Sequence, residues 1–375
     1  MSIHSQSKVA PEVPGMGRPV VFWAVSGVGW LALTVYIFGT WMVSSDIRPV
    51  PVGNDPVPGN VLFWVHFAEI AFFSVGMVFL LKFVVIPLIR TRDIPIDGLL
   101  LLNFLLLWWT DPMDNYMNLC FAYNGYLVNV GSWANFIPGF SYPGQEKFAE
   151  PLFLTGGIYL TWWLMSSMVG CWVLRVMRKR WPTLGIGWGI AAVFAVISIY
   201  SAVTEPTFLR LGVWAFPGIP QSLALFPGKA YQYPLYQVPL IGYVCTVFTL
   251  LRYYRDDKGQ LFVEKGLDRL NLSSPKKRLV TFLAIAGFVQ PFFAIGYYLP
   301  FNLFAIHTDT APALPSYLRT EMCGEGTEYA CPSGEWVPIP RRGDKLYVRP
   351  DDPRLPQDVR DAQGIAKTGD PYREE

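Results

Sequence analysis

Two carboxylates and two carboxamides follow a long apolar run in the first third of the chain. The segment WWTDPMDNYMN, residues 108–118, comes directly after LLLLNFLLL and contains Asp111, Asp114, Asn115 and Asn118. On an α-helix these positions have the spacing i, i+3, i+4 and i+7, so they share one face. Carboxyl groups partly removed from water suit general acid catalysis, and an ionised neighbour can take the proton back. We therefore predict that Asp111 and Asp114 act as acid and base.

The side chains around these acids could bind a substrate. Amides would orient its oxygens, and aromatic faces would stabilise a developing cation. The predicted substrate-binding residues are Asn103, Trp108, Trp109, Asn115, Tyr116, Asn118 and Tyr123. If a helix enters the membrane at Asp97, a rise of about 1.5 Å per residue places both aspartates in the outer third of a core about 30 Å thick. Alternatively, Pro112 ends the helix early and leaves both acids in water as an interfacial cap.

Other titratable side chains are predicted to reach the same level. His66 and Glu69 lie one helical turn apart in WVHFAEIAFF, and Glu205 closes another apolar segment on the same side. Ionisable groups inside a membrane are costly, so they usually face a cavity or a partner. We expect a shared pocket in which Glu69 and His66 form a second proton-handling pair and Glu205 is a supporting acid. The alternative is a structural His–Glu pair together with solvated helix ends.

The elements that would position these residues are transmembrane helices. Of 375 residues, 52% are hydrophobic and only 15% are charged, and the apolar runs reach the length of about 20 residues that a bilayer requires. Backbone amides cannot stay unpaired in hydrocarbon, so the spans must be helical. The predicted fold is all-α, a polytopic bundle of about seven transmembrane helices near residues 20–44, 61–89, 97–116, 152–177, 184–203, 238–254 and 279–305.

The distribution of Lys and Arg predicts the orientation of the bundle. The segments after the second, fourth and sixth predicted spans are basic, whereas the alternate segments carry few basic residues. The positive-inside rule then places the N-terminus in the cytoplasm and the C-terminal tail outside. We expect a multi-pass protein of the cell membrane with a cytoplasmic N-tail (1–19), a transmembrane domain (20–307) and an extracytoplasmic, Pro-rich tail (308–375).

Few other chemistries fit the sequence. With three His in the chain, a histidine-rich diiron site is excluded and a bis-His haem is disfavoured; a metal held by carboxylates stays open, but no metal site and no cofactor are predicted. There is no hydrolase, zinc-protease, P-loop or dinucleotide motif in a supporting context, and no basic footprint for nucleic acid. Cys323 and Cys331 are predicted to form a disulfide on the oxidising side, the alternative being two free thiols. The oligomeric state does not follow from the sequence.

Several longer segments carry a resemblance to a known family. The run into WWTDPMDNYMN, the loop through GSWANFIPGF, the span PLFLTGGIYLTWWLMSSMVGCWVLRVMRKRWP, and TEPTFLRLGVWAFPG resemble the spirocyclase AveC-like family of actinobacterial membrane proteins, over roughly residues 20–307. The resemblance implies a spiroketal cyclase, which dehydrates and closes a dihydroxy-ketone on a polyketide.

The sequence therefore favours a membrane cyclase or isomerase without a cofactor, acting on a lipophilic polyketide, steroid or terpenoid. One alternative is a proton- or cation-coupled transporter or a lipid-binding membrane protein, in which the same acids bind a proton or cation. A second alternative is a structural partner of another membrane complex.

Overall fold

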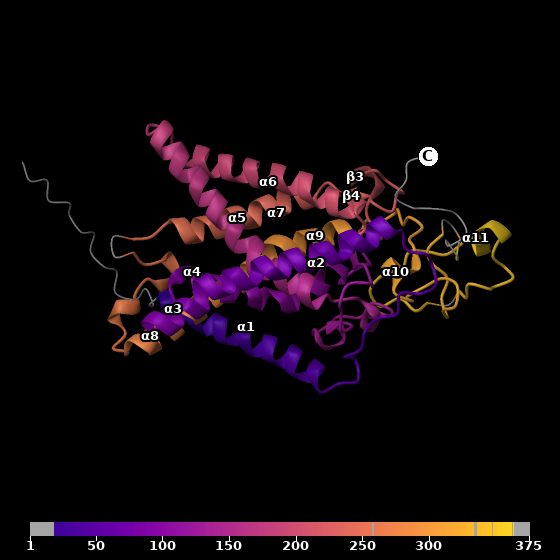
Figure 1. Cartoon of the computed structure of the whole chain (residues 1–375), viewed down its shortest axis with the longest axis horizontal. Coiled ribbons are helices and arrows are strands. Elements are labelled where there is room, and N and C mark those ends of the chain that lie inside the picture. The colour runs from indigo at the N-terminus through magenta and orange to yellow at the C-terminus, as the bar shows by residue number, and fades with distance from the viewer. Residues whose placement is uncertain (1–18, 257–258, 334–335, 347, 362, 364–375) are drawn as a thin grey trace, which may run out of the picture.

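The fold is an elongated helical bundle with a loop-rich cap at one end (Figure 1). A computed structural model describes residues 19–256, 259–333, 336–346, 348–361 and 363, so most of the predicted cytoplasmic N-tail lies outside the described residues. Within these ranges, five helical stretches are long and apolar enough to cross a membrane: Pro19–Met42, Gly59–Thr91, Leu152–Arg180, Ile186–Arg210 and Ser274–Ala305. These helices and their composition are those of a membrane protein.

The helices of the bundle have the following bounds. They are α1 (Pro19–Met42), α2 (Gly59–Leu80), α3 (Ile86–Thr91), α4 (Ile96–Leu105), α5 (Leu152–Arg180), α6 (Ile186–Arg210), α7 (Gln237–Tyr253), α8 (Ser274–Phe293) and α9 (Leu299–Ala305). Two predicted spans are shorter than a full transmembrane helix. Residues 97–116 divide between α4 and a 3₁₀ segment, η2 (Leu106–Asn115), and α7 has 17 residues. Both nevertheless run inside the bundle, where α4 packs on α5 and α8 and α7 packs on α5 and α6.

Two of the long helical stretches contain a widened π-turn immediately before a proline-bearing turn. These are η1 (Leu81–Val85), which precedes Pro87, and η8 (Ala294–Tyr298), which precedes Pro300. Proline has no N–H to donate and its ring clashes with the carbonyl four residues earlier, so a wider turn relieves the clash. The π-turn η8 is important below because it carries two tyrosines of the candidate site.

Two long outer loops, residues 116–151 and 211–236, fold over one end of the bundle. Strand β1 (Ala122–Tyr123) of the first long loop pairs antiparallel with β2 (Trp214–Ala215) of the second, and β3 (Ala224–Leu225) pairs with β4 (Tyr233–Pro234). Short 3₁₀ turns occur in these loops at Ala134–Phe136, Gln145–Lys147 and Gln221–Leu223, and in the connection from α7 to α8, at the opposite end of the bundle, at Phe262–Glu264 and Leu267–Arg269. The two loops at this end of the bundle are thus joined to each other by a short ladder.

The C-terminal tail adds a further layer above these loops. It has little regular structure beyond α10 (Ser316–Arg319) and α11 (Gln357–Asp361), and Cys323 and Cys331 are joined in a disulfide. Buried Arg319 interacts with Asp55 in the segment between α1 and α2. The tail therefore packs on the bundle.

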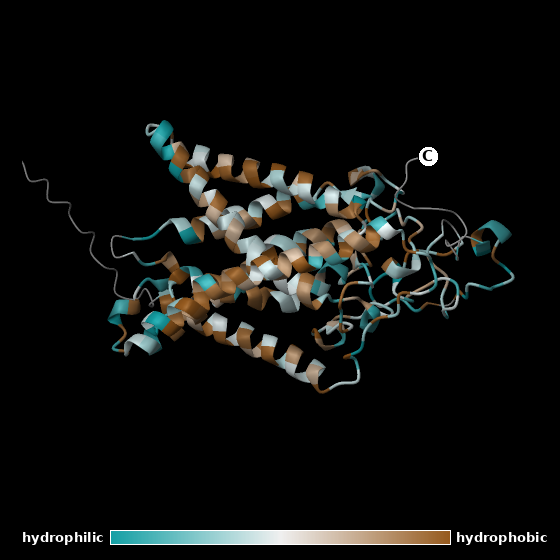
Figure 2. Cartoon of the chain, viewed as in Figure 1, coloured by the Kyte–Doolittle hydropathy of each residue, from teal (hydrophilic) through white to brown (hydrophobic). Residues whose placement is uncertain are grey.

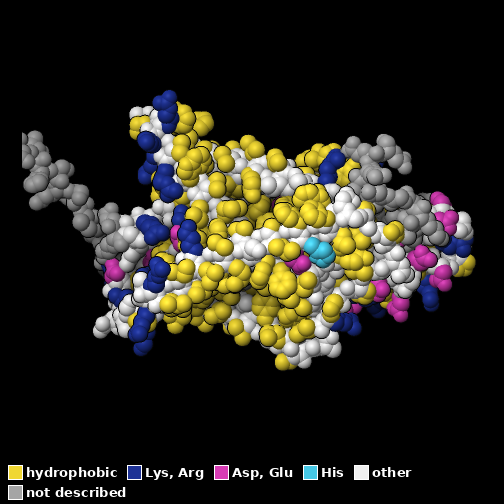
Figure 3. Space-filling model, in the orientation of Figure 1, with side chains coloured by type: hydrophobic (Ala, Val, Ile, Leu, Met, Phe, Trp, Pro, Cys, Tyr) yellow, Lys and Arg dark blue, Asp and Glu magenta, His cyan; other side chains and the backbone are white. Residues whose placement is uncertain are grey.

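Apolar side chains cover the middle of the molecule, as expected for a surface in contact with lipid. The helices are hydrophobic along their central parts, whereas hydrophilic residues gather at both ends and in the cap (Figure 2). Lys and Arg side chains cluster at the end opposite the cap (Figure 3). This end contains the connections after α3, α5 and α7, which the sequence predicts to be cytoplasmic.

Candidate active site

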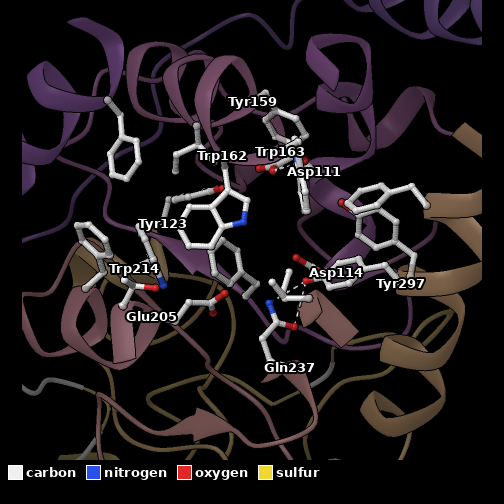
Figure 4. A pocket seen from close by; sticks show the side chains of 18 residues that line it. Asp111, Asp114, Tyr123, Tyr159, Trp162, Trp163, Glu205, Trp214, Gln237 and Tyr297 are labelled. Carbon is white, nitrogen blue, oxygen red and sulfur yellow. Dashed lines mark hydrogen bonds between the residues drawn. The ribbon is translucent and has the colours of Figure 1, made fainter. Parts of the chain in front are cut away.

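The bundle encloses a small acidic cavity near its capped end. It has a volume of about 110 Å³ and is lined by side chains from α2, η2, α5, α6, α7, α8 and η8 and from both long loops. Figure 4 shows three of its carboxyl groups among aromatic rings. The labelled lining residues are Asp111, Asp114, Tyr123, Tyr159, Trp162, Trp163, Glu205, Trp214, Gln237 and Tyr297.

Asp111 and Asp114 reach the cavity because the backbone that carries them is a 3₁₀ helix. The sequence predicted one α-helix through residue 116, but η2 has about three residues per turn, which places side chains at i and i+3 directly above each other. The hydroxyl of Tyr159 on α5 donates a hydrogen bond to Asp111 Oδ1 at 3.0 Å. Asp114 Oδ1 is buried and has no hydrogen-bond partner within the described part of the chain.

The third carboxyl group of the cavity, Glu205, comes from the last turns of α6. It is followed by Pro206, whose missing N–H leaves the backbone of the preceding turn less constrained. On the same side of the cavity as Glu205, the Gln237 side chain of α7 is hydrogen-bonded to the Tyr297 hydroxyl, with Nε2 2.8 Å from the oxygen. Tyr298, the next residue of η8, lies 3.2 Å from the Thr110 hydroxyl. The other lining residues are mostly aromatic, so the cavity offers only a few hydrogen-bonding groups.

The charge balance of the cavity is unusual. No Lys, Arg or His is among the side chains that line it in the described ranges. Like charges in a small, poorly solvated space repel strongly, so simultaneous ionisation of Asp111, Asp114 and Glu205 is unfavourable. At least one of the three carboxyl groups is therefore expected to hold a proton, which is the requirement for a general acid.

Glu150 is a fourth carboxyl group that sequence reasoning missed, because it ends a loop rather than a span. Its side chain is 2% exposed, and burial, followed by the charge of nearby Asp111, raises its pKa well above the usual glutamate value. Glu150 and Asp111 interact, and each has one buried oxygen, Oε2 and Oδ2, that accepts no hydrogen bond in the described chain. A proton on either carboxyl group would supply the missing donor. The pair is thus arranged to share one proton.

Tyr123 is the one predicted substrate-binding aromatic that lines the cavity. Its hydroxyl lies near both Asp111 and Glu150, and burial, with a smaller contribution from these two charges, raises the pKa of Tyr123 well above its ordinary value. The phenol therefore stays protonated and available as a hydrogen-bond donor. Its position is fixed by the β1–β2 ladder, which pairs Tyr123 with Trp214, another lining residue.

The structure does not bring His66 and Glu69 to the cavity. The His66 side chain is 48% exposed, and its Nδ1 lies 3.7 Å from Glu69 Oε2. The other Glu69 oxygen accepts a hydrogen bond from the backbone N–H of Val128 at 2.9 Å. This pair therefore joins α2 to the first long loop, and its predicted role in proton handling has no structural support.

The remaining predicted binding residues are also directed elsewhere. Asn115 Oδ1 accepts from the backbone N–H groups of Cys120 and Phe121, so its side chain shapes the loop after η2. Asn103 donates to the Leu99 and Phe282 carbonyls, and Asn118 is buried beneath the tail, where its backbone pairs with Arg341.

Three predicted aromatic residues pack around the site rather than in it. Trp109 donates to Gln290 and stacks on Trp30. Trp108 contacts Trp133, and Tyr116 lies against Phe140 and beneath the Arg342 guanidinium.

Taken over the residues that the structure describes, no group of three or more His, Cys, Asp and Glu side chains is arranged to hold a metal ion. The long apolar helices are those of a membrane protein, and its cavity is lined by carboxyl groups and aromatic rings. A family model described as spirocyclase AveC-like matches residues 91–318, and the chain belongs to this family. The match begins at residue 91, later than the predicted residue 20, and ends at residue 318, beyond the predicted residue 307 but before Cys323. No curated protein and no solved structure matches the chain.

The match includes all four acids described above. Asp111, Asp114, Glu150 and Glu205 fall within residues 91–318, whereas His66 and Glu69 fall outside. Membership of this family suggests a function of the cyclase type.

Proposed function

We propose that the protein is an integral-membrane cyclase that closes an oxygen ring on a lipophilic substrate by carboxylate acid–base catalysis. The observation that carries this proposal is the convergence of Asp111, Asp114 and Glu205 on one small cavity whose other walls are mostly aromatic. Family membership supports the reaction class. A dihydroxy-ketone that forms a spiroketal is the substrate type that fits both observations.

The chemistry requires only proton transfers. One hydroxyl of the substrate adds to the ketone carbon, its proton passes to a carboxylate, and the carbonyl oxygen takes a proton to give a hemiketal. A carboxylic acid then protonates the hemiketal hydroxyl, which leaves as water. The second hydroxyl attacks the resulting oxocarbenium ion and loses its proton to a carboxylate. In total, the C=O π bond, the C–O bond to the leaving water and two substrate O–H bonds break, while two ring C–O bonds and the two O–H bonds of water form, with no net redox change.

The geometry suggests a role for each acid. Asp111, held by the Tyr159 hydroxyl, and Asp114, which has an unpartnered buried oxygen, are the proposed acid and base. Glu205 faces them across the cavity and would stabilise the cation or accept the second proton. The oxocarbenium ion would lie among rings such as Trp162 and Trp163, whose faces attract cations. Glu150 would store the proton that Asp111 exchanges.

The arrangement in the membrane also belongs to the proposal. We infer about seven crossings, with α4–η2 and α7 completing the five longer helices, as expected for a multi-pass protein of the cell membrane. The cluster of Lys and Arg at the uncapped end supports a cytoplasmic N-terminus. The transmembrane domain (20–307) would hold the site, and the tail (308–375) would cover it from outside.

Purified protein in detergent tests this function. A surrogate substrate, a dihydroxy-ketone with a long alkyl chain, should lose one water and give the cyclic product, detected by mass spectrometry. Asp351→Asn, a neutralised acid on the exposed surface of the tail, should match the wild-type rate. A protein that gives no product in detergent, yet moves the surrogate or protons across sealed vesicles, would be a transporter.

A further inference from the structure

The acidic cavity is too small for a whole lipophilic substrate. Ligand sites for drug-sized molecules usually measure about 300–1,000 Å³. The volume here is about 110 Å³, and because a cavity needs roughly 10–15 Å³ by this measure for one water, it has room for about ten non-hydrogen atoms. The oxygenated segment that reacts fits this space, and the rest of the substrate must lie outside it.

One side of the cavity reaches the surface of the bundle. The floor residues, among them Trp163, Gln237 and Tyr297, are buried, whereas Phe72, Ile158 and Phe208 on the other side are half-buried. Phe72 on α2 and Phe208 on α6 face each other with ring centroids 5.7 Å apart. This pair spans the gap between two helices that both pack on α5. We call the opening bounded by Phe72, Ile158 and Phe208 the lateral window.

The backbone fixes one edge of the lateral window. A Cβ atom added to Gly157 of α5 would collide with the backbone of Phe72, so the glycine lets α2 lie directly against α5 at this level. Phe208 is held from the other side by Trp214, at a centroid distance of 4.8 Å. The backbone of Phe72 is therefore held against α5, and the Phe208 ring packs between the rings of Phe72 and Trp214.

The surface around the lateral window is apolar. Exposed apolar side chains near it include Phe73, which directly follows Phe72, and Phe153 of α5, whose ring centroid lies 4.9 Å from that of Phe73. The first charged residue along α6 beyond the window is Arg210, the last residue of the helix, whose guanidinium carbon lies 4.4 Å from the centroid of the Tyr231 ring. The window thus opens on the lipid-facing surface, close to the level of the headgroups.

The other connection from the cavity is too narrow for a substrate. Asp111 and Tyr123 also border a second space of about 10 Å³, which contains Glu150 and ends at Leu119 and Met322. Leu119 and Met322 in turn border a cavity of about 280 Å³ beneath the tail. A space of about 10 Å³ holds at most one water, so this connection suits protons or water.

We propose that the lateral window admits a membrane-dissolved, amphipathic substrate, whose oxygenated end enters the acidic cavity while its hydrocarbon part stays in the bilayer. This inference rests on the proposed cyclase function for the identity of the substrate, but the access route itself is independent of turnover. Phe72 and Phe208 form the gate. The substrate class is therefore a long-chain molecule with hydroxyl and carbonyl groups near one end, and the bilayer is its source.

Photolabelling tests the route without any catalysis. Full-length protein in phosphatidylcholine vesicles would be irradiated with a long-chain alcohol that carries a diazirine beside its hydroxyl group, and adducts would be mapped by mass spectrometry. We expect adducts on cavity residues such as Glu205 and Trp162. Phe208→Trp, which fills the gate with a larger ring, should reduce these adducts several-fold. Val203→Trp, on the exposed face of the same helix, should leave them unchanged.

Two results would overturn the lateral route. One is labelling confined to exposed lipid-facing residues, with cavity adducts produced instead by a short, water-soluble diazirine added outside. The other is unchanged cavity labelling in Phe208→Trp and also in Phe72→Trp, the second gate variant. Measuring both turnover and labelling of Asp111→Asn separates the two proposals. Turnover by this variant refutes the catalytic roles, whereas labelling of its cavity residues leaves the access route standing.

Discussion

The hydrogen bond from Tyr159 to Asp111 gives the sharpest single-atom test of the site. Tyr159→Phe removes one hydroxyl and keeps the ring, so the wall of the cavity and its packing are preserved. The deleted bond, 3.0 Å long, reaches the carboxyl group that we assign as acid or base. A hydrogen bond to a charged group contributes about 1.5–3 kcal/mol. At about 1.4 kcal/mol per factor of ten, the rate should fall by roughly 10- to 150-fold.

The rate of water loss from the surrogate dihydroxy-ketone, measured in detergent, checks this value. Tyr243→Phe is a matched control, because Tyr243 is 46% exposed on α7 and does not line the cavity. A thermal melt confirms that both variants are folded. If folded Tyr159→Phe turns over as fast as Tyr243→Phe, Tyr159 does not hold the working carboxyl group and Asp111 loses its assigned role.

Three further variants test other parts of the account. Glu205→Gln should slow turnover by about 10²–10⁴ if this carboxyl group takes a proton in the reaction, and an unchanged rate would remove it from the mechanism. Glu150 keeps its proton in the folded state above the pH at which the unfolded chain releases it, so wild-type stability should fall as the pH rises above the ordinary glutamate pKa of about 4.5. Glu150→Gln should lose part of that fall in melting temperature; an identical pH profile would contradict the burial argument. Glu69→Leu leaves the Val128 N–H without its acceptor and should cost about 1–3 kcal/mol of stability in a denaturation experiment. Lost turnover in folded Glu69→Leu would instead favour the catalytic role predicted from the sequence.

The acids of the site could be predicted from sequence because of where they stand along the chain. Asp111, Asp114 and Glu205 each follow a long apolar run, and a carboxyl group so close to hydrocarbon needs a cavity or a partner. Depth alone was enough to place these three at one level. The family resemblance, carried by the segments around them, was confirmed over residues 91–318.

Rotation about the helix axes could not be predicted in the same way. His66 and Glu69 have a suitable depth, but α2 turns them toward the surface and the first loop. In η2, three residues per turn replace 3.6, so Asp111 and Asp114 align while Asn115 turns to cap the loop backbone. Glu150 and Tyr159 gave no periodic or motif signal, since their contact with Asp111 depends on how the loop and α5 pack.

The most direct test of the central claim is the rate of ring closure by Asp111→Asn and Asp114→Asn proteins, purified and folded in detergent. Both substitutions keep the shape of the side chain and remove its ability to exchange a proton at working pH. We predict that each lowers product formation by about 10²–10⁴ relative to wild type and that Asp351→Asn does not. Full product formation by both folded cavity variants would contradict acid–base catalysis in this cavity.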